Sequence, residues 1–357
     1  MISKIVTLGD VCNKGSSNIA QKDLVDRDGI YPIYGAAGYI KNVDFAHQDK
    51  PYLAVVKDGA GIGRVMKLPA NSSIIGTMQY ILPKGNIDID YLYFALQYMN
   101  LSKYFSGSTI PHIYFRDYQK EKLPLPELSE QQGKAYVLLR IEQLIECYHQ
   151  QLTKLDELVK SRFIELFAGV EAEDTLQNLC TFIDYRGKTP EKVESGLPFI
   201  TAKNIRMHHM SFDTLEYISK ETYDRVMTRG FPQIGDVVFT TEAPLGNVCR
   251  IPFIETEFYI GQRIITMQTE RLEPAYLEYA LSSDEFKRKI AEKSSGSTVT
   301  GIRSKLLEQL TIPVPPRAQQ QQFAAFVEQT DKSKLVVHKS LEKLETLKKA
   351  LMQKYFG

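Results

Sequence analysis

Two short motifs hold residue types that could bind phosphate or a nucleotide, and each departs from the pattern that such binding needs. Gly187-Lys188-Thr189 matches the end of a phosphate-binding loop. The glycine that this loop requires upstream is replaced by Phe182, so no nucleotide cradle is expected. Gly59-Ala60-Gly61-Ile62-Gly63 has too many glycines, and the wrong following element, for a dinucleotide-binding turn. A tight hairpin is the expected use of these glycines.

Catalytic motifs are also missing. Methyl transfer would need an Asn/Asp-Pro-Pro-aromatic tetrapeptide, but Pro315-Pro316 lies between Val314 and Arg317. Asp184 and Glu191 flank Lys188 loosely, as in a nuclease, without a supporting strand pattern. We therefore expect no intrinsic catalysis. The alternative is a methyltransferase or nuclease with unrecognised motifs, which methylation by the purified chain alone would establish.

Cysteine and histidine usage predicts neither a metal nor a cofactor. The four cysteines are scattered without a CxxC motif or a Cys/His cluster. The pair His208-His209 points its side chains in different directions on any regular element. The N-terminus lacks the layout of a secretory signal. These features indicate a protein of the reducing cytoplasm.

Length and composition predict a soluble protein of more than one domain. The chain has 357 residues, 43% of them hydrophobic, and no uncharged apolar run long enough to cross a membrane. Its formal net charge is +1, which is not the basic balance of a typical nucleic-acid-binding protein. Any DNA-binding surface must therefore be a local patch.

One long stretch of the chain occurs twice. The first copy runs from Ser129 to Ala168, and the second from Ala318 to the C-terminus. Each follows a Pro-punctuated segment that resembles a strand, Leu123 to Pro126 in the first copy and Ile312 to Pro315 in the second. Because the lead-in repeats together with the stretch, the sequence indicates an internal duplication.

Apolar residues in both copies recur every three or four positions. This spacing is typical of a long amphipathic helix whose apolar seam needs a partner helix. Leu152 and Leu155 have Leu341 and Leu344 as their equivalents, so the register is kept. We expect each helix to pair with the other; two unrelated surface helices, each packed on its own domain, are the alternative. The predicted pairing residues are Leu138, Ile141, Ile145, Leu152, Leu155, Val337, Leu341, Leu344 and Leu351.

The globular parts of the chain read as mixed α/β domains of one plan. In the first, Pro51 to Val56 predicts a short buried strand, Lys57 to Arg64 a glycine-rich hairpin turn, and Ile89 to Phe105 a helix. The expected fold is α+β, with two similar domains separated by two long helices. The boundaries that we expect are 1–128 for the first domain, 129–172 for the first helix, 173–317 for the second domain and 318–357 for the second helix.

Motifs of the first domain recur in the second. Ala243 to Val248 corresponds to Ala60 to Val65, and Gly296-Ser297-Thr298 corresponds to Gly107-Ser108-Thr109. The offset between equivalent motifs grows through the globular parts and is constant through the helices. Insertions have therefore accumulated where a binding surface could vary, although neutral drift of loops after a duplication would leave a similar record.

Taken together, and in their order along the chain, these motifs make the chain resemble the DNA-specificity subunit of type I restriction–modification systems. The resemblance covers essentially the whole chain. It rests on the LPLP or IPVP segments, the Ser/Ala-x-Gln-Gln helix starts and the Gly-Ser-Thr loops in both halves. Target-recognition domains of that family also contain phrases similar to Tyr31 to Ile40, Asp184 to Pro190 and Leu197 to Ile205.

The resemblance implies a function and a set of partners. Each target-recognition domain would read one half of a split, asymmetric site on double-stranded DNA, and the helices would pair antiparallel as a spacer with pseudo-two-fold symmetry. Two methyltransferase subunits would dock on the assembly, and a restriction and translocase subunit would join through the complex. A helix from Gly133 to Ala168 would be roughly 54 Å long, more than one ~34–36 Å turn of duplex. A tandem scaffold that binds only protein is the alternative.

Candidate DNA contacts follow from what base reading requires. Arg can fork onto guanine and Asn onto adenine, while Lys and hydroxyl groups hold phosphates. Ser108, Thr109, Ser297 and Thr298 are expected to be turn formers first. The candidates are Lys41, Lys57, Arg64, His112 and Arg116 in the first domain, and Arg186, Lys188, Lys203, Asn204, Arg206, Asn247, Thr300 and Arg303 in the second.

Overall fold

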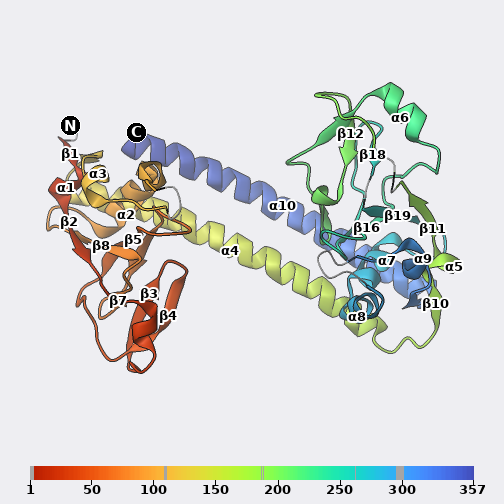
Figure 1. The fold of residues 1–357 in the computed structure, drawn as a ribbon, viewed down its shortest axis with the longest axis horizontal. Coiled ribbons are helices and arrows are strands. Elements are labelled where there is room, and N and C mark those ends of the chain that lie inside the picture. The colour runs from red at the N-terminus through yellow and green to blue at the C-terminus, as the bar shows by residue number, and fades with distance from the viewer. Residues whose placement is uncertain (1–3, 108–110, 186, 188, 262, 295–300) are drawn as a thin grey trace. The chain divides into compact units, whose positions relative to one another are not determined.

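The computed structural model describes residues 4–107, 111–185, 187, 189–261, 263–294 and 301–357 (Figure 1). Its chain forms two compact units. The first unit comprises Met1–Gln150 and Val337–Gly357, and the second comprises Gln151–Val336. Helix α4 spans Leu128–Phe167 and α10 spans Arg317–Phe356, so each long helix contributes one part of its length to each unit.

The globular part of the first unit is built on small sheets. A four-stranded sheet has the order β2-β8-β5-β6, a three-stranded sheet has the order β4-β3-β7, and β1 pairs with β9. Strands β3 and β7 run parallel, whereas the other pairs are antiparallel. The strands are β1 (Lys4–Thr7), β2 (Cys12–Ser16), β3 (Tyr31–Gly35), β4 (Gly38–Val43), β5 (Tyr52–Val56), β6 (Val65–Leu68), β7 (Ser73–Ile74), β8 (Met78–Pro83) and β9 (Lys122–Leu125). The helices are α1 (Leu8–Val11), η1 (Gln21–Leu24), α2 (Ile89–Met99), η2 (Leu101–Tyr104) and α3 (Phe115–Tyr118).

The second unit repeats this topology. Its sheets have the orders β11-β19-β16-β17 and β15-β12-β18, and β10 pairs with β20. Strands β12 and β18 are again the parallel pair. The strands are β10 (Glu173–Thr175), β11 (Thr181–Asp184), β12 (Leu197–Ile200), β15 (Glu216–Ile218), β16 (Val237–Thr240), β17 (Val248–Arg250), β18 (Tyr259–Ile260), β19 (Ile264–Gln268) and β20 (Thr311–Pro313). The helices are α5 (Leu176–Leu179), η3 (Ala202–Asn204), α6 (Lys220–Val226), α7 (Pro274–Ser282), α8 (Asp284–Lys293) and α9 (Ser304–Glu308).

A short hairpin of β13 (Ile205–Arg206) and β14 (His209–Met210) is inserted into the second unit. It follows η3 directly and lies against β17, because the N–H of His208 donates to the carbonyl oxygen of Val248 at 2.8 Å. This insertion lies in the region where the spacing between the two sequence copies grows. Mixed α/β domains with an internal repeat, as the sequence predicted, are confirmed.

The central strand of the first unit shows why these segments fold locally as they do. β5 reads YLAVV and is buried along its whole length, as a strand covered on both faces requires. The following glycine-rich turn leads into β6, so the predicted hairpin is confirmed. Gly63 has φ +80° there, and a Cβ at this position would lie 2.5 Å from the backbone N of Ser102. Only glycine fits.

The helix predicted from Ile89 to Phe105 is shorter than expected. Asp88 caps its start, accepting hydrogen bonds from the backbone N–H groups of Asp90 and Tyr91 at 3.0 Å. α2 then ends at Met99, because Asn100 adopts the left-handed conformation with φ +48°. The 3₁₀ helix η2 follows, so the continuous apolar pattern covers two elements joined by a sharp turn.

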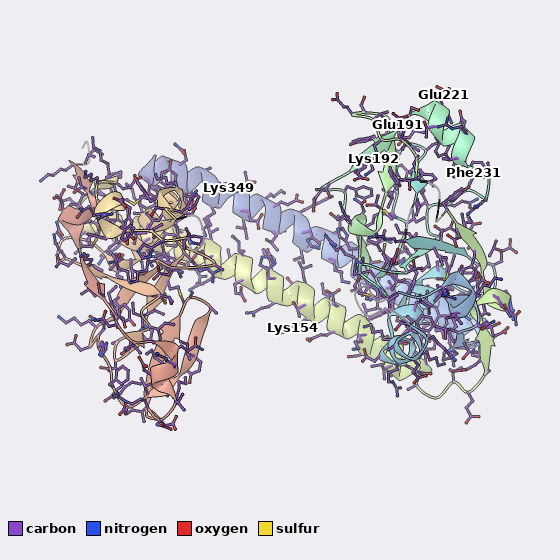
Figure 2. The ribbon with its side chains drawn as sticks, viewed as in Figure 1. Lys154, Glu191, Lys192, Glu221, Phe231 and Lys349 are labelled. Atoms are coloured by element: carbon purple, nitrogen blue, oxygen red, sulfur yellow. The ribbon has the colours of Figure 1, made fainter. Side chains whose placement is uncertain are left out.

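The two long helices pack together in an antiparallel pair, as expected. In the first unit, Leu138 of α4 shares a core with Met352 and Phe356 of α10. In the second unit, the ring of Phe163 of α4 lies 5.4 Å from that of Phe323 of α10. Partners on α10 thus have lower numbers as α4 proceeds, which is the antiparallel order. Side chains such as Lys154 of α4 and Lys349 of α10 project from the two helices (Figure 2).

Two lysines interrupt the apolar pattern of α10. Lys334 and Lys348 occupy seam positions, and their ammonium groups reach acids on α4. Lys334 Nζ lies 2.5 Å from Asp156 Oδ1 in the second unit, and Lys348 Nζ lies 2.6 Å from Glu142 Oε1 in the first. The aliphatic stems therefore pack in the seam while the charges are paired at its edge.

Candidate nucleic-acid interface

The glycine-rich turn of the first unit carries two of the predicted contacts, Lys57 and Arg64. The segment beyond the Gly-Ser-Thr loop lies against this turn, because Gly59 N–H donates to Pro111 O and Ile113 N–H donates to Lys57 O, both at 3.0 Å. His112 is thereby brought next to the turn. Its Nδ1 pairs with the Asp58 carboxylate, whose other oxygen lies 3.9 Å from Lys57 Nζ.

Arg64 connects this turn with the β3–β4 turn. Its exposed guanidinium donates from Nη1 to the carbonyl oxygen of Ala36 at 3.1 Å. The remaining N–H groups of an arginine fork can still meet an acceptor. Lys57, Arg64 and His112, separated in sequence, therefore form one surface, which we name the turn surface.

Arg116 lies beyond the turn surface, in a row of three side chains with His112 and Tyr114. Tyr114 was not among the predicted contacts. The ring centroids of His112 and Tyr114 are 4.1 Å apart, and Arg116 Cζ lies 4.7 Å from the Tyr114 centroid. Tyr114 is 42% exposed, so part of its ring is open to solvent beside the turn surface. Tyr114 precedes α3 in extended backbone and Arg116 lies inside α3, so simple strand alternation along the sequence does not predict this contact.

Lys41 is occupied within the protein. Its ammonium lies 2.5 Å from Asp28 Oδ1 and donates to the carbonyl oxygen of Leu24 at 3.0 Å. Nearby, Tyr39 is 60% exposed on β4 and forms an edge contact with Tyr34. Tyr39 is therefore more accessible on this hairpin than Lys41.

Lys203 and Arg206 are exposed in the second unit, on η3 and β13. Asn204, predicted to contact DNA, is 1% exposed. Its Oδ1 accepts from the N–H of Thr201 at 2.9 Å, and its Nδ2 donates to the carbonyl oxygens of Ser211 and Thr214 at 3.1 Å. The Asn204 amide therefore holds the surrounding loop together and is not open to a base in this structure, so the predicted contact would require this loop to rearrange.

Asn247 and Arg303 flank the second unit's version of the turn. The Asn247 amide is half-buried and donates to the carbonyl oxygen of Ile205 at 2.8 Å. Arg303 is exposed before α9, in a segment joined to the turn by an Ile302 N–H bond to Thr241 O of 3.0 Å. Arg263, which the sequence reading missed, lies beside this segment, with Nε 3.1 Å from Glu242 Oε1.

Some predicted residues fall outside the part of the chain that the structure describes. These are Arg186, Lys188 and Thr300, together with the turn formers Ser108, Thr109, Ser297 and Thr298. The predicted pairing residues are all described. Leu138, Ile141, Val337 and Leu341 are buried, whereas Ile145, Leu152, Leu155, Leu344 and Leu351 are half-buried.

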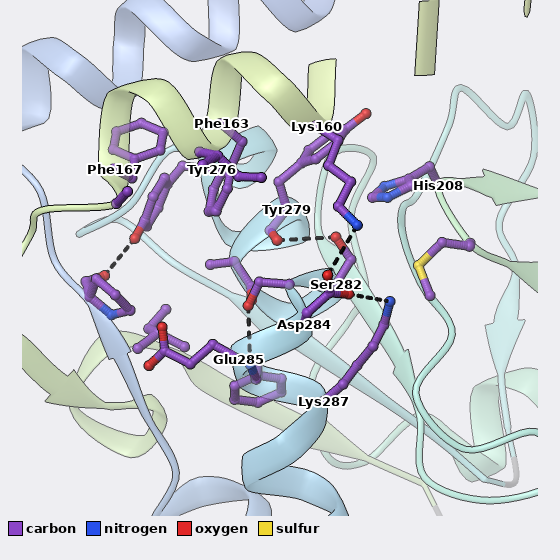
Figure 3. A pocket seen from close by; sticks show the side chains of 18 of the residues that line it. Lys160, Phe163, Phe167, His208, Tyr276, Tyr279, Ser282, Asp284, Glu285 and Lys287 are labelled. Atoms are coloured by element: carbon purple, nitrogen blue, oxygen red, sulfur yellow. Dashed lines mark hydrogen bonds and ion pairs between the residues drawn. The ribbon is translucent and has the colours of Figure 1, made fainter. Parts of the chain in front are cut away.

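A cavity of about 530 Å³ lies in the second unit between α4, α7 and α8 (Figure 3). Its wall includes the rings of Phe163, Phe167, Tyr276 and Tyr279. At its rim, Asp284 carboxylate oxygens lie 3.1 Å from the ammonium of Lys160 and 3.7 Å from that of Lys287. The predicted DNA contacts do not line this cavity.

In the part of the chain that the structure describes, no group of three or more His, Cys, Asp or Glu side chains could hold a metal ion. Within the same ranges, no helix has the length and apolar character needed to cross a membrane.

Two domains of one topology, each followed by a long helix that pairs with its counterpart, define a tandem-domain protein with two paired long helices. The family model of the type I restriction modification DNA specificity domain matches residues 3–157 and 175–346, and the chain belongs to this family. It is thus a type I specificity subunit with two target-recognition domains.

Two curated relatives and two solved structures are similar over most of the chain. The type I restriction enzyme MjaVIII specificity subunit of Methanocaldococcus jannaschii is 24% identical over 327 residues, covering 83% of this chain and 76% of that protein. The putative MjaX specificity subunit of that organism is 25% identical over 305 residues, covering 75% of this chain and 67% of that protein. A type I restriction-modification S subunit from M. genitalium has a TM-score of 0.65 at 15% identity, covering 99% of this chain and 96% of that chain. A chain from a study of complex assembly and conformational transition of the type I system has a TM-score of 0.53 at 16% identity, covering 99% and 97%.

Proposed function

We propose that this chain directs a type I restriction–modification complex to a bipartite, asymmetric site on double-stranded DNA, with one half-site read by each target-recognition domain. Two methyltransferase subunits dock on it, and a restriction and translocase subunit joins through the complex. The chain itself is a non-catalytic recognition subunit that works in the cytoplasm.

One observation carries the proposal: the two units place different side chains at the same point of one topology. Val55 pairs with Val65 in the β5–β6 hairpin, and Phe239 pairs with Val248 in the β16–β17 hairpin. Arg64 and Asn247 each precede the second strand, so they are equivalent. Arginine favours guanine and asparagine favours adenine in direct readout. Different base-contacting side chains at equivalent positions of one topology favour different half-sites, whereas identical side chains would favour a palindrome.

The helices supply a spacer of suitable length. α4 and α10 each have 40 residues. A helix of 40 residues is roughly 60 Å long, and the half-sites of a two-headed DNA reader are separated by one or more turns of ~34–36 Å. Pairing stiffens the helices, so the separation of half-sites should depend on their length.

The near-neutral charge bears on affinity rather than on specificity. A net charge of +1 supplies little of the phosphate attraction that dominates non-specific binding. We therefore expect weak DNA binding by the isolated chain and strong binding once methyltransferase subunits contribute further phosphate contacts.

Methylome sequencing of a host with and without this chain tests the proposal. A bipartite motif that disappears with the chain supports it. Exchanging residues 1–128 for another first domain should then change only one half of the motif. Changes in both halves would contradict modular reading.

The scaffold alternative gives a different result in the same system. A chain that binds only protein would retain no specific DNA, even with its methyltransferase partner present. Methylation by the purified chain alone would instead establish an enzyme and overturn the non-catalytic assignment.

A further inference from the structure

An ionic network centred on Arg250 and the buried carboxylate of Glu278 joins the second domain to the spacer helix inside the second unit. Arg250 of β17 lies at its centre, with Nε 2.6 Å from Glu278 Oε2 and Nη2 2.8 Å from Asp331 Oδ2. Glu278 belongs to α7 and is 1% exposed, while Asp331 belongs to α10. One planar guanidinium therefore connects a sheet strand, a domain helix and the spacer.

The network continues to the other spacer helix. The second carboxylate oxygen of Asp331 lies 4.0 Å from Lys334 Nζ, which lies 2.5 Å from Asp156 Oδ1 on α4. The sheet of the second domain is thus linked to both helices through side chains that alternate in charge. These charges pair with one another only when the strand and the helices keep this arrangement.

The Glu278 carboxylate also holds the β13–β14 hairpin. His208 Nδ1 donates to Glu278 Oε1 at 2.9 Å, and its ring stacks on Tyr279 with centroids 4.2 Å apart. His208 has φ +59°, a conformation that L residues rarely adopt. These contacts keep it there. The hairpin also carries Arg206, an exposed candidate DNA contact, so Glu278 positions a reading element as well as the sheet.

The first unit uses the equivalent positions differently. Lys67 pairs across its hairpin with Leu53 as Arg250 pairs with Val237, so the two basic residues are equivalent. Lys67 forms its ion pair with Asp90 at the start of α2. Glu142, the α4 residue equivalent to Asp331, pairs with Lys348 of α10. In the first unit one of these ion pairs therefore lies within the domain, and the other lies between the two long helices.

We propose that Arg250, Glu278 and Asp331, with His208, are positioning residues that orient the reading surface of the second domain on the spacer. This inference rests on the proposed function. Only Glu278 among these side chains is fully buried, and replacing buried ion pairs by apolar residues of similar size often leaves stability unchanged, because the attraction offsets the cost of desolvation. A planar guanidinium that pairs with two carboxylates at once does, however, require one relative arrangement of the three groups. The network therefore contributes orientation more than stability.

The test uses the chain assembled with its methyltransferase partner and three DNAs: the methylome-defined site, a copy with the first half scrambled, and a copy with the second half scrambled. The variant combines Arg250→Met, Glu278→Leu and Asp331→Ala. We expect discrimination at the second half-site to fall at least about tenfold, the scale of one lost base contact, with first-half discrimination unchanged. The matched control, Lys67→Met, should leave both ratios unchanged.

A second readout does not depend on DNA. Hydrogen exchange at the His208 amide, which donates to Val248 O, should become faster in the triple variant while the core strand β16 stays protected. Arg250→Lys provides a milder change, because a single ammonium cannot form the two-carboxylate fork. It should lower second-half discrimination even if the triple variant fails to fold.

Several outcomes would overturn the inference. Unchanged second-half discrimination in Arg250→Lys or in a folded triple variant would show that the network does not position the reader. Equal losses of discrimination at both half-sites would show that the network stabilises the whole assembly and does not position one reading surface. If the wild-type complex discriminates at neither half-site, the proposed function itself fails. The hydrogen-exchange result then decides separately whether the network holds the hairpin.

Discussion

The side-chain oxygen of Gln131 accepts a hydrogen bond from the backbone N–H of Asp88, 2.9 Å away. The Gln131 amide also donates to Pro126 O at 2.9 Å, fastening the Pro-punctuated segment to the start of α4. Gln320 makes the equivalent pair of bonds with Glu273 N–H and Pro315 O at the start of α10. The repeated glutamine in the sequence is thus a structural clasp between each domain and its long helix.

Gln131→Leu should destabilise the first unit. The substitution leaves the Asp88 N–H and the Pro126 carbonyl oxygen without this partner, at a cost of about 1–3 kcal/mol in free energy of unfolding. Denaturant unfolding would measure it, and Gln132→Leu on the exposed side of the same turn is the control. Equal effects of the two substitutions would contradict the clasp.

Leu152→Asp combined with Leu341→Asp should separate the long helices. Leu341 is 6% exposed, and burying an unpaired carboxylate in an apolar seam costs several kcal/mol. We expect loss of bipartite recognition in a methylation assay. Leu347→Asp, at a site on α10 that is 47% exposed, is the control. Full site protection by the double variant would count against the spacer role.

Arg64→Ala should weaken reading of the first half-site. Removing a forked contact with a base typically costs about 1–3 kcal/mol. Competition binding with DNAs altered in one half would detect it, and Lys349→Ala on α10 should have little effect. Equal weakening across all sequences would instead make Arg64 a phosphate contact.

The pH dependence of stability should reveal Glu278. Burial alone would raise the pKa of its carboxyl, but the hydrogen bond from His208 and the charge of Arg250 hold it below the ordinary value of 4.5. This contribution to stability is complete above about pH 4.5 and is lost as the pH falls through the lower pKa of the folded state. The free energy of unfolding of Glu278→Gln should therefore depend less on pH below 4.5. Parallel curves for the two proteins would refute this.

Cys147 should be the thiol that reacts first in the native protein. It is exposed on α4, whereas Cys12, Cys180 and Cys249 are buried. Burial raises the pKa of Cys12 and of Cys180 to about 12 and also raises that of Cys249, which suppresses the reactive thiolate. A disulfide-exchange reagent should label one thiol quickly, and Cys147→Ser should abolish that phase. Fast labelling of a second thiol would mean that a core opens readily.

Residue patterns along the chain were enough to predict the duplication, the two mixed domains and the paired helices. These features rest on local periodicity and on the repeat of the Pro-punctuated segment together with its helix. Both can be seen by comparing one half of the sequence with the other. The break at Asn100 was missed because α2 and η2 have one continuous apolar pattern, and the left-handed residue between them leaves little trace in composition.

The candidate site depended far more on tertiary structure. Asn204 and Arg206 are two residues apart and look equally suitable for reading bases, yet packing buries the first and exposes the second. Tyr114 gains its place beside His112 and Arg116 where the extended backbone turns into α3, and Arg250 meets Asp331 across 81 positions of sequence. Periodicity determines which face of an element is apolar. Which polar groups meet, and which remain open to a ligand, depends on long-range packing.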